Sequence, residues 1–275
     1  MKAAAFEYLR PKSVAEASVA LGRKGMTTAA IAGGQSLVPM LNLRVAPIDL
    51  LVDISRLDDL KALAKTPDGV WIGALTTHAA IEDGKAPDIF AGLMRRVAGQ
   101  ISYRAVRNHG TIGGSVALAD PAADWPCCLV ALDATIRVAG RNGVRVQSVA
   151  EFVRGPYETT LINGDIIVGF DIPSPDAGFR WGFAKVARKS GAFANSIAIA
   201  TEQGRDGAVS VILGAAGPRP LRMHNVANLL RGGSDQDLRA AIAADLALHA
   251  PDVDAYQKRL HTATILRAIH DMKLQ

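Results

Sequence analysis

Two glycine pairs in the sequence could hold a phosphate-bearing ligand. The first lies in Ala32-Gly33-Gly34-Gln35-Ser36-Leu37 and the second in Thr111-Ile112-Gly113-Gly114-Ser115. Glycine lacks a Cβ and reaches positive φ, so consecutive backbone N–H groups can face one anion, and Ser and Thr hydroxyls add donors. We therefore expect the amides of both turns to converge on a pyrophosphate. A tight bend would explain either turn alone, so the prediction depends on the pair.

Comparison with known phosphate-binding motifs excludes two kinds of nucleotide site. Neither turn matches GxGxxG or GxxxxGK[ST], so the sequence predicts neither a Rossmann dinucleotide site nor a P-loop. Asp124 follows the second turn, and an ionised carboxylate only accepts hydrogen bonds, which suits the hydroxyls of a polyol. The alternative is that Asp124 caps the helix that leads into Leu129.

The remaining reactive residue types do not form a recognisable site. None of the six histidines forms HxxxH or HExxH, and the adjacent Cys127 and Cys128 suit neither a thiolate cage nor an ordinary disulfide. We predict no metal site and no catalytic nucleophile in this chain, and we expect both cysteines to be buried. His261 and His270 are expected on roughly the same side of a helix, at the surface.

The elements that must position the glycine turns follow from hydrophobic patterning. Ser13 and Glu16 predict a capping box for a helix over residues 14–23, and apolar runs at 28–32 and 50–54 predict strands on either side of the first turn. Turn signals at 66–69 and 140–143 predict hairpins, and apolar residues at helical spacing predict a helix over 88–101.

The clearest boundary is Pro173-Ser174-Pro175-Asp176-Ala177-Gly178, which excludes regular structure. Beyond it we expect a three-stranded antiparallel meander at 181–187, 196–201 and 209–214, and then helices near 225–230, 235–249 and 254–273. The predicted domains are 1–175, with subdomains at about 1–56 and 57–175, and 176–275.

Composition bounds the class of protein. A chain of 275 residues with 49% hydrophobic and 21% charged residues is large enough for one or two globular domains. The net charge of +5 is spread without a Lys/Arg block, so nucleic acid is not a predicted partner. Residues 26–43 are uncharged, but Gly, Gln, Ser, Pro and Asn interrupt them, so we predict a loop and no membrane span. Glu7 and Tyr8 disfavour a signal peptide, and we expect a cytoplasmic protein.

The sequence resembles a known family in three ordered motifs. The runs 32–39 (AGGQSLVP), 107–115 (RNHGTIGGS) and 120–124 (DPAAD) are similar to the FAD-binding medium subunit of molybdenum hydroxylases, of the aerobic carbon monoxide dehydrogenase and xanthine dehydrogenase type. Further similarity at 155–161 and 183–187 extends the resemblance over nearly the whole chain. It implies an α+β protein with a two-part PCMH-type FAD-binding domain, which combines a small α/β subdomain with a mixed or antiparallel sheet, and a small C-terminal domain.

The resemblance also implies site residues and partners. Non-covalently bound FAD would contact the two glycine turns and Asp124; Lys185 would lie near the flavin, where a cation favours its reduced form, or else be a solvated lysine. The backbone of Leu161 would border the ring, or Leu161 would belong to the core, and His109 is left without an assigned role. Partner subunits would carry a molybdopterin cofactor and two [2Fe–2S] clusters, in a large and a small subunit that are each present twice.

The implied function is electron transfer from the iron–sulfur clusters through FAD to an external acceptor. An alternative is a self-sufficient FAD-dependent oxidase or dehydrogenase with its own small substrate, and another is a scaffold that has lost the cofactor. The hydroxylated compound stays open among carbon monoxide, purines and N-heterocycles. The acceptor stays open among NAD⁺, oxygen, a quinone and a cytochrome.

Overall fold

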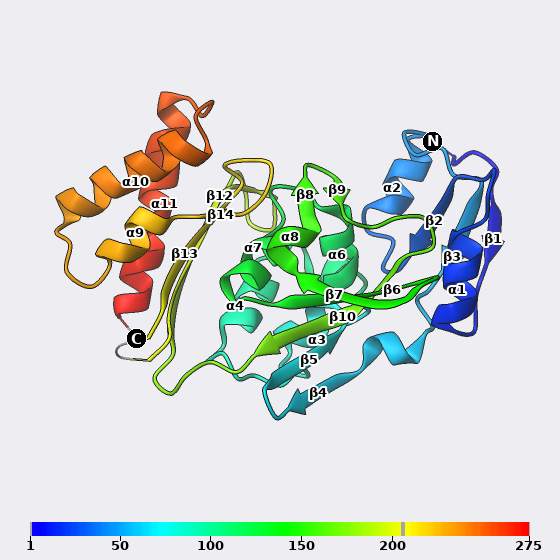
Figure 1. The fold of residues 1–275 in the computed structure, drawn as a ribbon. Coiled ribbons are helices and arrows are strands. Elements are labelled where there is room, and N and C mark those ends of the chain that lie inside the picture. Colours follow the sequence, from blue (N-terminus) through cyan, green and yellow to red (C-terminus); the bar gives the residue numbers. More distant parts are fainter. Residues whose placement is uncertain (1, 205–206, 275) are drawn as a thin grey trace.

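The structure is a computed structural model that describes residues 2–204 and 207–274. Three larger sheets follow one another along the molecule, with the N-terminus beside the first and the C-terminal helices outside the last, and a fourth sheet has only two short strands (Figure 1). Helices fill the spaces between the sheets. This arrangement confirms the predicted α+β class.

The first sheet belongs to a small α/β unit and carries the first glycine turn. Parallel strands β1 (Glu7–Leu9), β3 (Leu50–Asp53) and β2 (Thr28–Ile31) lie in the order β1-β3-β2. Helix α1 (Val14–Leu21) begins after Ser13, whose Oγ accepts from the Glu16 amide at 3.1 Å. The capping box is only half formed, because the Glu16 carboxylate accepts from the Lys12 amide instead. The first turn lies between β2 and α2 (Leu37–Asn42).

The middle sheet is antiparallel, in the order β4-β5-β10-β6-β7. Its strands are β4 (Leu63–Thr66), β5 (Gly69–Gly73), β10 (Ile166–Pro173), β6 (Thr135–Gly140) and β7 (Gly143–Ser148). The short elements around it are η1 (Asp58–Lys61), α3 (His78–Glu82), α4 (Leu93–Gly99), α5 (Arg104–Arg107), α6 (Ile112–Leu118), α7 (Asp124–Ala131), α8 (Val149–Phe152), β8 (Val153–Gly155) and β9 (Glu158–Thr159).

Helix α7 is buried at every residue because one hydrophobic cluster contains side chains from both the middle and the C-terminal sheet. Trp125 and Leu129 of α7 share this cluster with Ile197 and Ile212 of the C-terminal sheet. Such an all-round apolar helix is typical of a fully enclosed position. Both cysteines lie on α7, free and buried as predicted.

The C-terminal sheet is antiparallel and has four strands instead of the expected three. They are β11 (Arg180–Ala187), β12 (Ala194–Glu202), β13 (Val209–Gly214) and the two-residue β14 (Leu221–Arg222). One face packs on α7, and α9 (His224–Leu229), α10 (Asp235–His249) and α11 (Ala255–Lys273) cover the other (Figure 1). Gly182 is the point of closest approach, since a Cβ there would lie 1.8 Å from the Ala268 carbonyl oxygen of α11. The division into domains 1–175 and 176–275 stays our proposal.

Two local predictions were wrong. The helix expected over 88–101 is shorter, because Asp88 Oδ1 accepts from the Gly92 amide at 3.0 Å and Gly92 has a φ of 88°, so that α4 begins only at Leu93. His261 and His270 lie on opposite sides of α11, because nine residues make two and a half turns. His261 is buried with Nδ1 2.9 Å from Ser196 Oγ, whereas His270 is exposed.

Among the described residues, none of the helices combines the length and the apolar character needed to cross a bilayer. In the same part of the chain, no group of three or more His, Cys, Asp or Glu side chains is placed to hold a metal ion.

Candidate functional site

The two glycine turns meet in space. Gly33 lies so close to the second turn that a Cβ there would be 2.0 Å from the His109 carbonyl oxygen and 2.9 Å from Gly110 Cα. At Gly114, a Cβ would be 3.9 Å from Ala32 Cβ. The prediction that turns about eighty residues apart come together is therefore confirmed.

A cavity of about 500 Å³ opens where they meet. The predicted residues that line it are Ala32, Gly33, Gly34, Gln35, Ser36, Leu37, Thr111, Gly113, Gly114, Ser115, Asp124, Leu161 and Lys185. Ile112 is the exception: its side chain is fully buried in the core because it is the first residue of α6 and faces the middle sheet. All three parts of the chain, the α/β unit, the middle part and the C-terminal sheet, therefore contribute walls.

The first turn presents free backbone donors. Gly34 has a φ of 69°, which reverses the chain between β2 and α2. Within the described part of the chain, the amides from Gly33 to Leu37 have no hydrogen-bond acceptor, although the carbonyls of Gly33 and Gly34 accept from the Gln35 side chain and the Val38 amide. Five consecutive unpaired N–H groups beside a cavity form a typical anion-binding concavity.

The second turn differs from our expectation, because its amides from Ile112 to Ser115 are already bonded. Those of Ile112 and Gly113 donate to the carbonyls of Thr76 and Ala74, and that of Gly114 donates to Thr111 Oγ1 at 3.0 Å. These bonds cap α6 and tie it to the segment after β5. The second turn therefore supplies the Thr111 and Ser115 hydroxyls, whereas the consecutive run of free amides among the described residues lies in the first turn.

Asp124 and Lys185 form a buried ion pair at the wall of the cavity. Both side chains are 5% exposed, and Lys185 Nζ donates to Asp124 Oδ2 at 2.9 Å and to the Gln100 carbonyl at 3.1 Å. The solvated-lysine alternative is therefore wrong. The Asp124 side chain does not cap α7, because it turns instead to Lys185 on β11.

One oxygen of this pair is left open. Nζ is also 2.9 Å from Asp124 Oδ1, but the hydrogen-bond geometry is satisfied only at Oδ2, so Oδ1 is buried without a donor among the described residues. Burial raises the pKa of Asp124 to about 6, and the adjacent Lys185 ammonium opposes this rise. The carboxylate is thus mostly ionised at neutral pH and can accept a bond from a ligand hydroxyl.

Leu161 and His109, whose roles the sequence left open, lie in different surroundings. Leu161 lines the cavity and packs against the core, and its amide donates to Thr159 Oγ1 at 3.2 Å, so its N–H is not available to a ligand. The His109 side chain is exposed and does not line the cavity. His109 contributes its backbone carbonyl, which is in contact with Gly33.

His78 is a cavity residue that sequence reasoning missed. Trp125 Nε1 donates to its Nδ1 at 2.9 Å, which leaves the proton of the neutral ring on Nε2, beside Gly110. Burial, and secondarily the Arg107 charge, lower the pKa of His78 to about 4. The only sequence signal was its place in Thr76-Thr77-His78, directly after an apolar strand, where Thr77 caps α3.

We expect His78 to remain neutral, with its proton on Nε2, at about pH 6. Because its pKa is lower in the folded than in the unfolded state, the stability that it contributes is present above about pH 6.5 and is lost as the pH falls toward about 4. Trp125→Phe, which leaves Nδ1 without a donor, should cost about 1–3 kcal/mol of unfolding free energy. Histidine ¹⁵N shifts and urea titrations check both points, and a wild-type ring protonated on Nδ1 would contradict the assignment.

Comparison with known proteins identifies the family to which this chain is similar. Residues 4–175 match the model described as the FAD binding domain in molybdopterin dehydrogenase. The chain is 31% identical, over 100% of its length and 95% of the relative's, to the 6-hydroxypseudooxynicotine dehydrogenase complex subunit alpha of Paenarthrobacter nicotinovorans.

Solved structures agree with the sequence match. A chain of carbon monoxide dehydrogenase from Hydrogenophaga pseudoflava superposes with a TM-score of 0.92 at 30% identity, covering 100% of this chain and 99% of that one. For quinoline 2-oxidoreductase from Pseudomonas putida 86 the TM-score is 0.87 at 30% identity, covering 98% and 99%. The protein therefore belongs to the family of FAD-binding chains of molybdopterin dehydrogenases, which are subunits of oxidoreductases.

Proposed function

We propose that this chain is the electron-transferring FAD subunit of a molybdenum hydroxylase complex. It would take electrons from [2Fe–2S] clusters in a small partner subunit and pass them to an external acceptor, while a large partner subunit with a molybdopterin cofactor carries out the hydroxylation. The observation that carries the proposal is the cavity at the junction of the two glycine turns, with free amides at one end and the Asp124–Lys185 pair in its wall.

The residues present fit a flavin dinucleotide. Gly33 and Gly114 allow the two turns to approach closely beside the cavity, and five free amides suit a diphosphate. The orphan Asp124 Oδ1 is a buried acceptor that requires a donor, and a ribityl or ribose hydroxyl would supply one. Bound FAD would supply the ability to accept electrons singly and release them in pairs.

The chain's own residues would bind and orient the cofactor. The amides from Gly33 to Leu37 would neutralise the diphosphate as fixed partial charges, so that no lysine is needed there. The Ser36, Thr111 and Ser115 hydroxyls would add donors, and Asp124 would fix a polyol hydroxyl. Lys185, already held by Asp124 and Gln100, would keep one positive charge at a set position in a water-poor wall.

Partner subunits are proposed from the relatives. One relative is a subunit of a dehydrogenase complex, and two are medium chains of carbon monoxide dehydrogenase. We infer the same setting here, with large, medium and small subunits each present twice. The relatives are named for different compounds, including carbon monoxide, caffeine and nicotine, so the substrate would be chosen outside this chain.

Ligand competition tests the cofactor site. We expect the purified chain to bind one FAD, ADP to displace it because ADP carries the diphosphate, and riboflavin at the same concentration to leave it bound. Equilibrium dialysis followed by flavin absorbance measures all three. If riboflavin displaced FAD as effectively as ADP, a site built around the diphosphate would be contradicted. If the chain did not bind FAD at all, the proposed function would be rejected.

A further inference from the structure

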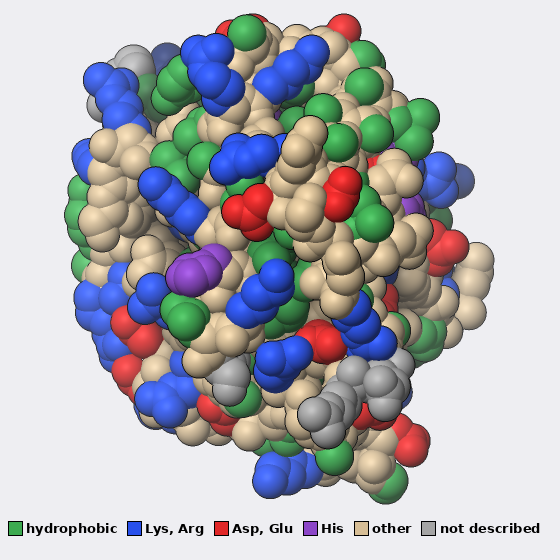
Figure 2. Space-filling model, turned by 90° about the vertical axis from the view of Figure 1, so that its left-hand side faces the viewer, with side chains coloured by type: hydrophobic (Ala, Val, Ile, Leu, Met, Phe, Trp, Pro, Cys, Tyr) green, Lys and Arg blue, Asp and Glu red, His purple; other side chains and the backbone are tan. Residues whose placement is uncertain are grey.

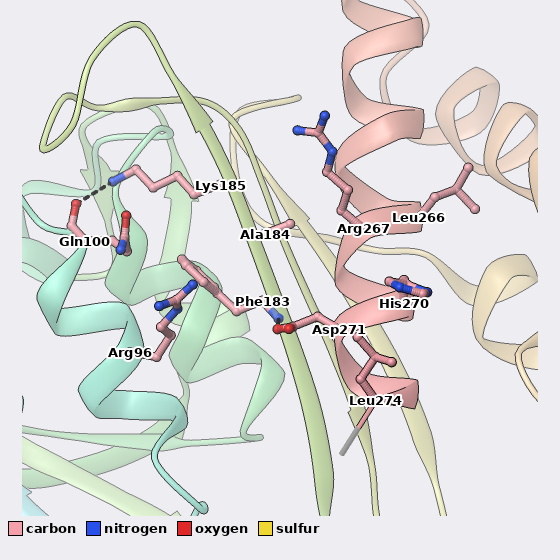
Figure 3. Close-up of a pocket in the computed structure, with 10 residues that line it drawn as sticks. All are labelled: Arg96, Gln100, Phe183, Ala184, Lys185, Leu266, Arg267, His270, Asp271 and Leu274. Carbon is pink, nitrogen blue, oxygen red and sulfur yellow. Dashed lines mark hydrogen bonds between the residues drawn. The ribbon is translucent and has the colours of Figure 1, made fainter.

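A second cavity lies between α4 and the C-terminal sheet, and it shares Lys185 with the lining of the first cavity. It is an open groove of about 510 Å³, lined by Arg96 and Gln100 of α4, by residues 183–185 of β11 and by one stripe of α11. Figure 3 shows β11 between the two helices, with Arg96 on one side and Arg267 on the other. The groove thus follows the outer edge of the C-terminal sheet, because β11 is its first strand.

The hydrogen-bond pattern of β11 shows which backbone groups face the groove. The Phe183 amide donates to Asp271 Oδ2 at 3.1 Å, so it points away from β12. Alternate residues of an antiparallel strand point their amides and carbonyls to the same side. The Phe183 carbonyl and both backbone groups of Lys185 therefore also face outward, while the Lys185 side chain is turned to Asp124.

The Asp271 carboxylate accepts a hydrogen bond from the outward amide of Phe183, as a carbonyl of a neighbouring strand would. The next outward amide, that of Lys185, has no acceptor within residues 2–204 and 207–274. An edge strand with free backbone groups is a template for strand addition. The groove floor therefore offers free backbone groups at the edge of the C-terminal sheet.

The walls indicate the charge of that strand. Arg96 and Arg267 are exposed and form no ion pair in the described part of the chain, and His270 lies in the same stripe. Asp271 is the one acidic side chain among the lining residues, and it is already bonded. Basic side chains also extend over the neighbouring surface of the C-terminal helices (Figure 2).

We propose that this groove binds an extended, acidic segment of a partner polypeptide, which adds to β11 as a fifth strand of the C-terminal sheet. Main-chain hydrogen bonds to Phe183 and Lys185 would fix its register, and carboxylates would pair with Arg96 and Arg267. From Leu266 to Leu274 the helix wall is about 12 Å long, which matches about four extended residues. The strand would use the backbone of Lys185, whereas the proposed cofactor site uses the Lys185 side chain.

A defined peptide tests the proposal on the FAD-loaded full chain. The probe is a fluorescein-labelled, blocked heptapeptide of alternating Glu and Val, and a second peptide carries methyl groups on every internal backbone nitrogen. We expect saturable anisotropy with the first, slower amide exchange over residues 183–187, and no saturable binding of the methylated peptide, which keeps its charge but cannot donate. Equal binding of both peptides would mean that binding depends on charge alone, and it would overturn strand addition.

Charge-reversal variants locate the site. Arg96→Glu combined with Arg267→Glu should weaken peptide binding about tenfold or more, whereas Arg259→Glu, exposed on the same helix but outside the groove, should not. All variants are expected to retain FAD, which also shows that they fold. No saturable binding by the wild-type chain, or a loss in Arg259→Glu equal to that in the double variant, would overturn the proposal.

Discussion

Gly33→Ala is expected to lower the affinity for FAD about 10–100-fold. The added Cβ would lie 2.0 Å from the His109 carbonyl oxygen and 2.6 Å from its carbon. Because these are backbone atoms, no rotamer change relieves the contact, and the two turns must separate. Overpacking of this kind costs about 1–3 kcal/mol, and here the cost affects the walls of the binding cavity directly. Isothermal titration with FAD measures the effect.

A second glycine provides the control. Gly232 has no heavy atom within 4 Å of its Cβ position and no positive φ, so Gly232→Ala should change affinity by less than about twofold. If Gly33→Ala bound FAD as tightly as this control, the close approach of the two turns would not matter for binding.

Lys185→Met should lower the free energy of unfolding by about 3–5 kcal/mol at about pH 8, because it leaves the Asp124 carboxylate buried without its cation. Burial already raises the pKa of Asp124 to about 6, and without the opposing ammonium the pKa rises further. The folded state then holds the proton more tightly than the unfolded chain. The stabilisation that this bound proton gives the folded state is complete below about pH 4 and is lost as the pH rises through the folded-state pKa of Asp124. The variant should therefore lose less unfolding free energy at about pH 5 than at about pH 8.

Urea titrations at the two pH values measure this dependence. Lys65→Met is the control, since Lys65 is an exposed strand lysine with no ion pair among the described residues. The double variant Lys185→Met, Asp124→Leu should recover most of the loss, because it leaves no unpaired buried charge. A pH-independent loss, or one that the double variant does not recover, would contradict the buried pair.

Local patterning predicted most of the fold. Helix α10 has the predicted bounds, and α11 starts one residue after Asp254, because strong N-caps and amphipathic spacing mark these helices. Strand β14 was missed because two residues carry no period. Residues 88–92 were wrongly predicted to be helical, because the spacing of apolar residues does not show that the Asp88 side chain stabilises a turn there.

The site was less predictable where it depends on contacts between distant elements. The glycine pairs predicted a diphosphate site, and in the structure bonds from Gly113 to Ala74 and from Gly114 to Thr111 occupy amides of the second turn. The role of His78 depends on Trp125, which is 47 residues away in the chain. Such pairings need coordinates, because spacing along the chain does not show which groups are already bonded.

Amide NMR during a titration with ADP tests whether the first turn binds a diphosphate through its amides. We expect the amides from Gly33 to Leu37 to shift and become protected from exchange together, whereas those from Ile112 to Ser115 are protected before ADP is added. First-turn amides that remain unprotected at saturating ADP would contradict this expectation.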